Sequence, residues 1–156
     1  MFNNIFESIF KKPKLVVLSD GDLGLAKEIT AKVMGSSFNL RKEVLFTSSL
    51  GEKDLLGKKC LITRFGGEDA VKLREKNQLK VLTFGFKEGP DIWASDLKQN
   101  NGTTFKINYL GKSVPVWIKS SSQEEIHSVL VAIAIGLVFG LNMVQISQAL
   151  GSPQEI

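Results

Sequence analysis

The sequence predicts an α/β domain, a three-layer sandwich with a mostly parallel sheet that is extended by a small antiparallel three-stranded meander. In the first half of the chain, short apolar runs typical of strands buried on both faces alternate with helical segments. In the second half, polar and apolar residues alternate between tight turns, and two helical segments close the chain. With 156 residues and 43% hydrophobic content, the chain is long enough for one compact core.

The first half is organised as strands alternating with helices, which is typical of a parallel sheet. Lys11-Lys12-Pro13-Lys14 forms a break after the N-terminal segment. The next strand, turn and helix are expected at Leu15–Leu18, Ser19–Asp22 and Leu23–Met34. Two further strands, separated by a charged helical stretch, are expected at Leu61–Thr63 and Val81–Phe84, with the helix around 69–76.

The second half changes to alternation, which predicts strands with one buried face. Asn100-Asn101-Gly102 and Leu110-Gly111-Lys112 are tight-turn sequences between these strands. The three antiparallel strands are expected at Ile92–Leu97, Thr103–Tyr109 and Ser113–Ile118. The closing helices are expected at Gln123–Phe139 and Met143–Leu150, separated by Gly140-Leu141-Asn142.

Two apolar segments could indicate binding to a membrane or to a protein partner. Residues 1–12 place Phe2, Ile5, Phe6, Ile9 and Phe10 at helical spacing but have no basic n-region and no cleavage site, so we interpret them as an amphipathic helix and not a secretory signal. Three roles are expected as alternatives for this helix: to cover the domain, to dock a protein partner or a second copy, or to touch a membrane surface. Val129–Val144 is uncharged for 16 residues, shorter than the roughly 20 that cross a bilayer. No transmembrane segment is therefore expected, and Gly136 and Gly140 are expected to permit close packing of a helix on the sheet.

Charge and cysteine content narrow the class of protein. The 20 basic and 16 acidic residues give a net charge of +4, and the basic residues are spread along the chain. This bias is too weak to favour nucleic acid as a partner. Cys60 is the single cysteine, which excludes an internal disulfide, and its apolar flank favours a buried core thiol. Together with the absence of a leader, this predicts a cytoplasmic protein.

The residues from Val81 to Leu150 resemble the end of the central, ATP-handling domain of the Mur ligases. That resemblance covers about 70 residues and includes a strand ending in Thr-Phe-Gly, a meander, and an alanine-rich helix closing on Gly-Leu. It implies a Mur-ligase-like α/β domain over residues 13–156. The matching residues are Thr83-Phe84-Gly85, Asp91, Ala94-Ser95-Asp96, Gly102-Thr103-Thr104-Phe105, Val114-Pro115-Val116, Ala132-Ile133-Ala134, Gly140-Leu141, Ile146 and Leu150.

The resemblance also implies a phosphate loop after the first strand. Such a loop uses glycines for backbone access, a lysine for phosphate charge, and a Ser or Thr hydroxyl for magnesium. Aligned through Lys27-Glu28, Leu23 stands at the lysine position and Gly24 at the hydroxyl position, and two carboxylates would repel phosphate. The degenerate loop comprises Ser19, Asp20, Gly21, Asp22, Leu23 and Gly24.

The family's Gly-x-His-Asn nucleotide motif is degenerate as well. Aligned through the alanine-rich helix, it falls on Ser122–Glu125, so that Glu124 and Glu125 replace the histidine and the asparagine. These two carboxylates suit the first turn of a helix capped by Ser121 or Ser122. We interpret the only histidine, His127, as a packing or surface residue and not as a displaced ligand.

Other polar groups do not form a recognisable catalytic set. Glu88, Asp91 and Asp96 have no identifiable histidine, lysine or cysteine partner, and Asp91 belongs to a Gly-Pro-Asp turn. Trp93 and Trp117 lie on meander strands, where they favour packing over a ligand platform. No catalytic residue and no metal ligand is therefore predicted.

Three functional hypotheses remain. The first is a Mur-ligase-like pseudoenzyme that binds a partner, linked to peptidoglycan precursor synthesis, with no cofactor. The second is a fragment of an ATP-dependent ligase that another chain completes, which requires ATP and magnesium. The third is a small-nucleotide or membrane-associated binding module that uses the N-terminal helix.

Overall fold

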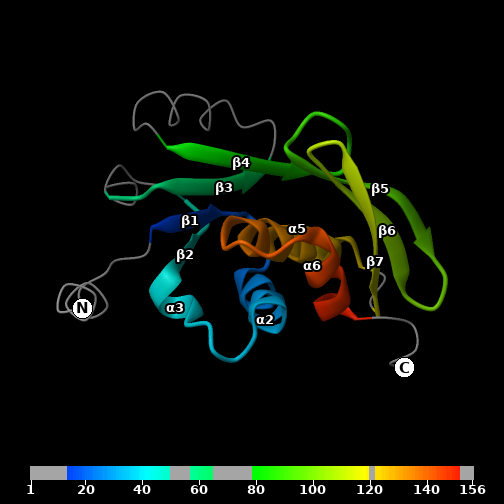
Figure 1. Ribbon diagram of the computed structural model, residues 1–156, viewed down its shortest axis with the longest axis horizontal. Coiled ribbons are helices and arrows are strands. Elements are labelled where there is room, and N and C mark those ends of the chain that lie inside the picture. Colours follow the sequence, from blue (N-terminus) through cyan, green and yellow to red (C-terminus); the bar gives the residue numbers. More distant parts are fainter. Residues whose placement is uncertain (1–13, 50–56, 65–78, 120–121, 152–156) are drawn as a thin grey trace.

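A computed structural model describes residues 14–49, 57–64, 79–119 and 122–151 of the chain (Figure 1). The amphipathic segment 1–12 and the helix expected around 69–76 lie outside the described residues. The strands are β1 (Leu15–Leu18), β2 (Val44–Thr47), β3 (Cys60–Arg64), β4 (Lys80–Gly85), β5 (Ile92–Gln99), β6 (Thr103–Tyr109) and β7 (Lys112–Ile118). The helices are α2 (Leu23–Met34), α3 (Leu40–Glu43), α5 (Gln123–Val138) and α6 (Met143–Leu150).

All seven of these strands form one sheet in the order β2-β1-β3-β4-β5-β6-β7. The pairs from β2 through β5 are parallel, and the β5–β6 and β6–β7 pairs are antiparallel. Strand β5 joins the parallel part through only two residue pairs, Phe84 with Ile92 and Gly85 with Trp93. The predicted fold class is confirmed, and the meander continues the parallel sheet instead of standing beside it.

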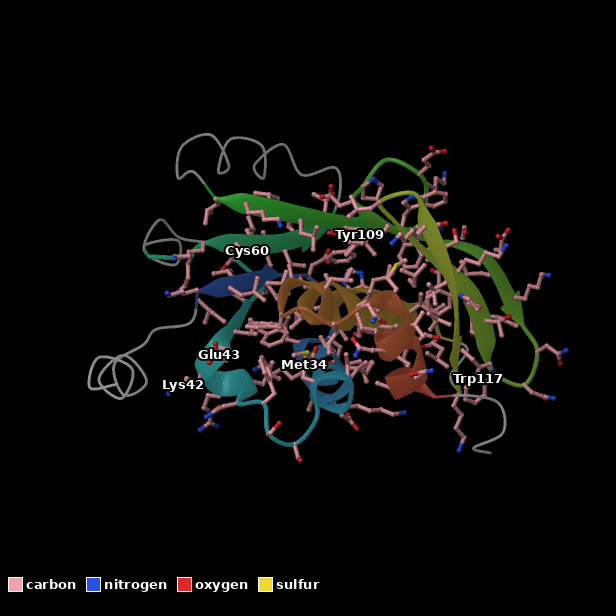
Figure 2. The ribbon with its side chains drawn as sticks, in the orientation of Figure 1. Met34, Lys42, Glu43, Cys60, Tyr109 and Trp117 are labelled. Atoms are coloured by element: carbon pink, nitrogen blue, oxygen red, sulfur yellow. The ribbon has the colours of Figure 1, made fainter. Side chains whose placement is uncertain are left out.

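The sheet buries apolar side chains on both faces. Alternate residues of β1, such as Leu15 and Val17, belong to a large core shared with the helices, whereas Val16 lies in a second cluster with Leu61 and Val81. Helices α2, α5 and α6 lie on the same side of the sheet (Figure 1). Figure 2 shows side chains filling the space between this helical layer and the strands. Burial on both faces explains why the parallel strands are almost continuously apolar.

Side-chain oxygens cap the N-termini of the helices. Asp22 caps α2, Ser122 caps α5, and Asn142 caps α6 in a capping box with Gln145. Each cap accepts a hydrogen bond from a backbone N–H group that has no partner within its helix. The predicted start of α2 at Leu23 is confirmed, and so is the serine cap of α5.

The two glycines near the end of α5 differ from the expectation of helix-to-sheet packing. A Cβ atom at Gly136 would lie 2.9 Å from Cδ1 of Ile146 and 3.4 Å from Cγ1 of Val33. Gly136 therefore allows α5 to approach α6 and α2, which are helices and not strands. Gly140 has a φ of +95° with no atom within 4 Å of a Cβ position, so it ends the helix in a conformation that favours glycine.

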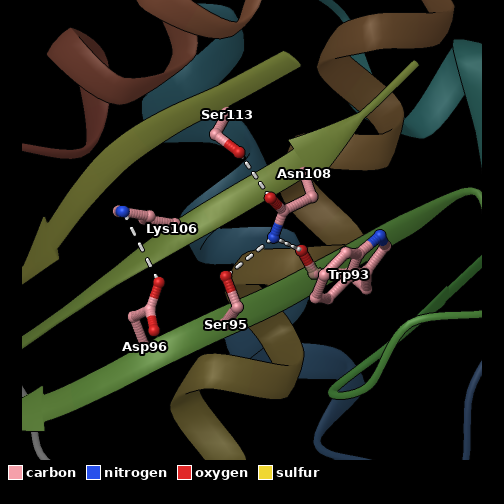
Figure 3. A network of polar contacts seen from close by, with 6 residues as sticks. All are labelled: Trp93, Ser95, Asp96, Lys106, Asn108 and Ser113. Atoms are coloured by element: carbon pink, nitrogen blue, oxygen red, sulfur yellow. Dashed lines mark hydrogen bonds and ion pairs between the residues drawn. The ribbon is translucent and has the colours of Figure 1, made fainter. Parts of the chain in front are cut away.

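Polar contacts hold the strands of the meander in register on one face (Figure 3). Asn108 on β6 donates from Nδ2 to the backbone oxygen of Trp93 at 3.1 Å and to Oγ of Ser95 at 2.9 Å, both on β5. Ser113 on β7 donates from Oγ to Oδ1 of Asn108. One amide side chain thus links three strands, and these polar groups are accounted for by structure.

Candidate functional site

The centre of the candidate site is the loop that follows β1, where it meets the N-terminal part of α5. The carboxyl ends of parallel strands lie at the same end of the sheet, and in α/β proteins ligands usually bind there. Ser19 directly follows β1 and is 5% exposed. Its Oγ lies 2.9 Å from Nε2 of His127, a residue 108 positions away on α5. The fold therefore joins the predicted loop to the only histidine of the chain.

Side chains of the loop accept hydrogen bonds from backbone N–H groups of the kind that would otherwise bind an anion. The N–H of Gly21 donates to Oγ of Ser19 at 3.1 Å, and the N–H of Leu25 donates to Oδ1 of Asp22 at 3.0 Å. A carboxylate of the chain itself thus sits at the N-terminus of α2, the position at which a helix attracts an external anion. Two backbone N–H groups at this loop, those of Gly21 and Leu25, are thus bonded to side chains of the loop itself.

His127 fills the space against this loop. It is 8% exposed, and its ring meets the ring of Phe84 edge-on at a centroid distance of 5.1 Å. A Cβ atom added at Gly21 would lie 3.0 Å from Cδ2 of His127. Of the two interpretations of His127, a packing or a surface residue, this burial supports packing, and its hydrogen bond to Ser19 was not predicted.

Burial lowers the pKa of His127 below its ordinary value of 6.5, and the positive charge of Arg64 lowers it further. The carboxylates of Asp20 and Glu124 act in the opposite direction. Because the neutral ring is favoured, the Ser19 hydroxyl can donate to Nε2 while its oxygen accepts from Gly21. The pair is thus one buried, neutral hydrogen-bonded contact.

The residues present do not fit magnesium-ATP. Leu23 and Gly24 offer neither an ammonium nor a hydroxyl group to a nucleotide, and both belong to the first turn of α2. Oδ1 of Asp22 lies 3.3 Å from a Cβ position at Gly24, so the carboxylate stands beside the place where a hydroxyl would be needed. Among the described residues, no group of three or more histidine, cysteine, aspartate or glutamate side chains is arranged to hold a metal ion.

The two glutamates predicted to occupy the degenerate nucleotide motif face different neighbours. Glu124 is exposed and lies close enough to His127 to influence its pKa. Glu125 is half-buried and lines a separate pocket formed with α2, the end of β7 and Leu150. Glu124 and Glu125 were assigned to one motif from the sequence, but on the helix Glu124 lies near His127 and Glu125 lines the separate pocket.

The remaining candidate groups have structural roles. The carboxylate of Asp91 accepts hydrogen bonds from the backbone N–H and the hydroxyl of Thr83 at 2.8 and 3.0 Å, which closes the link between β4 and β5. Asp96 lies at a β-bulge with a φ of +55° and pairs with Lys106 at 3.6 Å. Burial raises the pKa of the Cys60 thiol, which disfavours the reactive thiolate.

Comparison with known proteins shows the fold but not a sequence family. No protein-family model matches the chain, and no curated protein matches it in sequence. MurF from Acinetobacter baumannii is similar in structure, with a TM-score of 0.64 and 13% identity over 92% of this chain and 46% of the MurF chain.

Two further ligases are similar at the same level. A UDP-N-acetylmuramoyl-L-alanyl-D-glutamate–2,6-diaminopimelate ligase gives a TM-score of 0.68 and 10% identity over 92% of this chain and 47% of its own. The UDP-N-acetylmuramate:L-alanyl-γ-D-glutamyl-meso-diaminopimelate ligase from Neisseria meningitides gives 0.62 and 13% over 94% and 68%. The chain thus spans about half the length of the first two ligases, and its fold is Mur-ligase-like.

Proposed function

We propose that this chain is a Mur-ligase-like domain that neither binds nor turns over ATP and that acts by binding a protein partner in the cytoplasm. The observation that carries the proposal is the closed loop after β1, in which Ser19 and Asp22 accept hydrogen bonds from the N–H groups of Gly21 and Leu25 and His127 packs against Gly21. A phosphate would have to displace a carboxylate that already caps α2, at a like-charge cost. None of the helices in the described ranges is long and apolar enough to span a membrane.

The proposed link to peptidoglycan precursor synthesis rests on the structural neighbours, whose names describe ligases of UDP-N-acetylmuramoyl compounds. A domain with such a fold that does not bind a nucleotide can still associate with another protein. Partner binding is therefore the activity that remains compatible with the closed loop.

Calorimetry with magnesium-ATP tests the proposal directly. We expect no binding at millimolar nucleotide. A dissociation constant of about 100 μM or tighter, roughly −5.5 kcal/mol, would overturn the proposal and favour the alternative of a ligase fragment completed by another chain.

A restored loop provides the matched positive variant. Asp20→Gly, Asp22→Asn, Leu23→Lys and Gly24→Thr together remove two negative charges and add one positive charge and a hydroxyl group. The introduced asparagine would still cap α2, because asparagine is as good an N-cap as aspartate. Weak, salt-sensitive binding of pyrophosphate or ADP is expected. If the folded variant shows none, the loop is not a disabled phosphate loop, and the argument from its closure fails.

A further inference from the structure

A second concave region lies beside the closed loop, between α2, the N-terminal part of α5, the end of β7 and the end of α6. We name it the α2–β7 pocket. Its volume is about 450 Å³, within the range of roughly 300–1,000 Å³ typical of ligand sites. Its lining residues are Leu25, Glu28, Ile29, Lys32, Trp117, Ile118, Lys119, Glu125, Val129 and Leu150.

The deep part of the α2–β7 pocket is apolar and preformed. Ile29, Val129 and Leu150 are buried and belong to the main core. Trp117 is 9% exposed, and its ring is held close to the turn before β6, since a Cβ atom at Gly102 would lie 2.9 Å from Nε1 of Trp117. A fixed apolar floor of this kind suits one large apolar side chain.

The rim of the pocket carries equal numbers of positive and negative groups. Glu28 and Lys32 lie one turn apart on α2, whereas Lys119 follows β7 and Glu125 lies in the first turn of α5. Nζ of Lys32 donates to the backbone oxygen of Leu150 at 3.0 Å. Glu28, Lys119 and Glu125 make no ion pair with any residue in the described part of the chain. The α2 side of the rim therefore offers Glu28 and Lys32, and the side formed by β7 and α5 offers Lys119 and Glu125. Of these four charged groups, all except Lys32 are unpaired within the described residues.

This pattern selects among occupants by charge. A phosphate or another simple anion would meet Glu28 and Glu125, and a simple cation would meet Lys32 and Lys119. An uncharged apolar ligand would cover rim charges without pairing them, which costs free energy. A chain segment with an apolar residue between a basic and an acidic residue satisfies both the floor and the rim.

We infer that the α2–β7 pocket is the docking site for a peptide segment of a partner protein, in which an apolar side chain inserts between flanking residues of opposite charge. This inference rests on the proposed partner-binding function and names the partner's chemistry. The apolar anchor supplies the contact area, and the rim charges exclude segments whose charges have a single sign.

Blocked peptides provide the probes for the full-length chain. Acetyl-Lys-Leu-Leu-Glu-amide and acetyl-Glu-Leu-Leu-Lys-amide are compared with versions that carry two lysines, two glutamates or two glutamines. Amide chemical shifts in nitrogen-15 spectra give both the site and the dissociation constant. We expect at least one mixed-charge peptide to shift the amides of Leu25, Lys119 and Val129, and to bind at least threefold more tightly than every control. Equal binding of all five peptides, or no shifts at these residues, would overturn the inference.

Substitutions of charged rim residues distinguish charge pairing from non-specific binding of the peptide. Glu125→Gln and Lys119→Gln should each weaken the mixed-charge peptide by about two- to fivefold, the effect of one partly exposed ion pair. Glu88→Gln and Lys87→Gln make the same charge changes at exposed positions in the link after β4 and should leave binding unchanged. If the two pairs of substitutions act alike, the rim does not select the peptide.

The two proposals fail separately. Tight ATP binding would reject the proposed function, whereas peptide-induced changes in the amide chemical shifts at the α2–β7 pocket could still be present. Absence of peptide shifts with no ATP binding would reject the α2–β7 pocket and leave the loop proposal standing.

Discussion

The two sides of the N-terminal part of α5 offer a direct comparison. On one side, His127 meets Ser19 and Gly21, and the Ser19 hydroxyl is hydrogen-bonded both to His127 and to the N–H of Gly21. On the other side, Glu125 and Val129 line a pocket whose rim charges are largely unpaired within the described residues. One helix therefore packs against the loop after β1 on one side and lines the α2–β7 pocket on the other.

This difference has a physical origin in how each side is filled. The closed side is filled by one aromatic ring in contact with backbone, so small changes in volume there are costly. The open side is bounded by long charged side chains, whose ends stay in water while their stems cover apolar surface. Substitutions should therefore affect stability on the closed side and binding on the open side.

The largest effect is expected from Gly21→Val. A Cβ atom at Gly21 would already be 3.0 Å from Cδ2 and 3.2 Å from Nε2 of His127, and the branched side chain adds two methyl groups beside a buried ring. We expect the free energy of unfolding to fall by about 2 kcal/mol, as is typical of overpacking. Urea denaturation monitored by tryptophan fluorescence measures the change.

A double variant sharpens this prediction. His127→Ala opens the space that the introduced valine needs, so Gly21→Val should cost much less in that background than in the parent chain. An equal cost in the two backgrounds would contradict direct packing of His127 on the loop and would weaken the contrast between the two sides of α5.

An intermediate effect is expected from Asp22→Ala. Loss of the cap leaves the N–H of Leu25 without its side-chain acceptor, and the free energy of unfolding should fall by about 1 kcal/mol. Asp22→Asn is the matched control, since it keeps the acceptor oxygen but removes the charge. If the alanine variant is as stable as the asparagine variant, Asp22 does not occupy the anion position at α2, and the loop is more open than its hydrogen bonds indicate.

Much of the fold was predictable because the signals are local. Leu15–Leu18 and Leu23–Met34 have the predicted bounds, since a four-residue apolar run and a capped amphipathic segment each specify one element. Leu40–Glu43 and Val44–Thr47 were missed. A single helical turn is too short to show a period, and β2 is an edge strand that forms because β1 provides a pairing edge.

The candidate site was predictable only in its loop. Ser19 to Gly24 could be located because a strand, a turn and a helix follow one another in sequence. The Ser19–His127 contact joins residues 108 positions apart, and the α2–β7 pocket draws on four elements, so neither leaves a local pattern. Glu124 and Glu125 illustrate the limit, because neighbouring residues on a helix point about 100° apart and serve different neighbours.

The smallest effect is the pH dependence contributed by His127. Its pKa is lowered in the folded state, chiefly by burial and then by Arg64, so at mildly acidic pH the unfolded chain binds the proton more readily than the folded chain. The stabilising contribution of neutral His127 is therefore complete above about pH 6.5, the ordinary histidine value, and is lost as the pH falls from there towards the folded-state pKa. His127→Gln cannot be protonated and should lack this dependence.

Urea denaturation of both chains between pH 5 and pH 8 checks this, because the titrating carboxylates are common to both and largely cancel in the difference. We expect the stability advantage of the parent over His127→Gln to shrink as the pH is lowered. Asp20→Asn should leave the onset of the loss unchanged but extend it to lower pH and make it larger, since Asp20 is a charge that raises the folded-state pKa of His127. An advantage that grows towards acidic pH would mean that Asp20 and Glu124 outweigh burial and Arg64. His127 would then be a charged group at the loop after β1, and that side of α5 would hold a cation beside the N-terminus of α2.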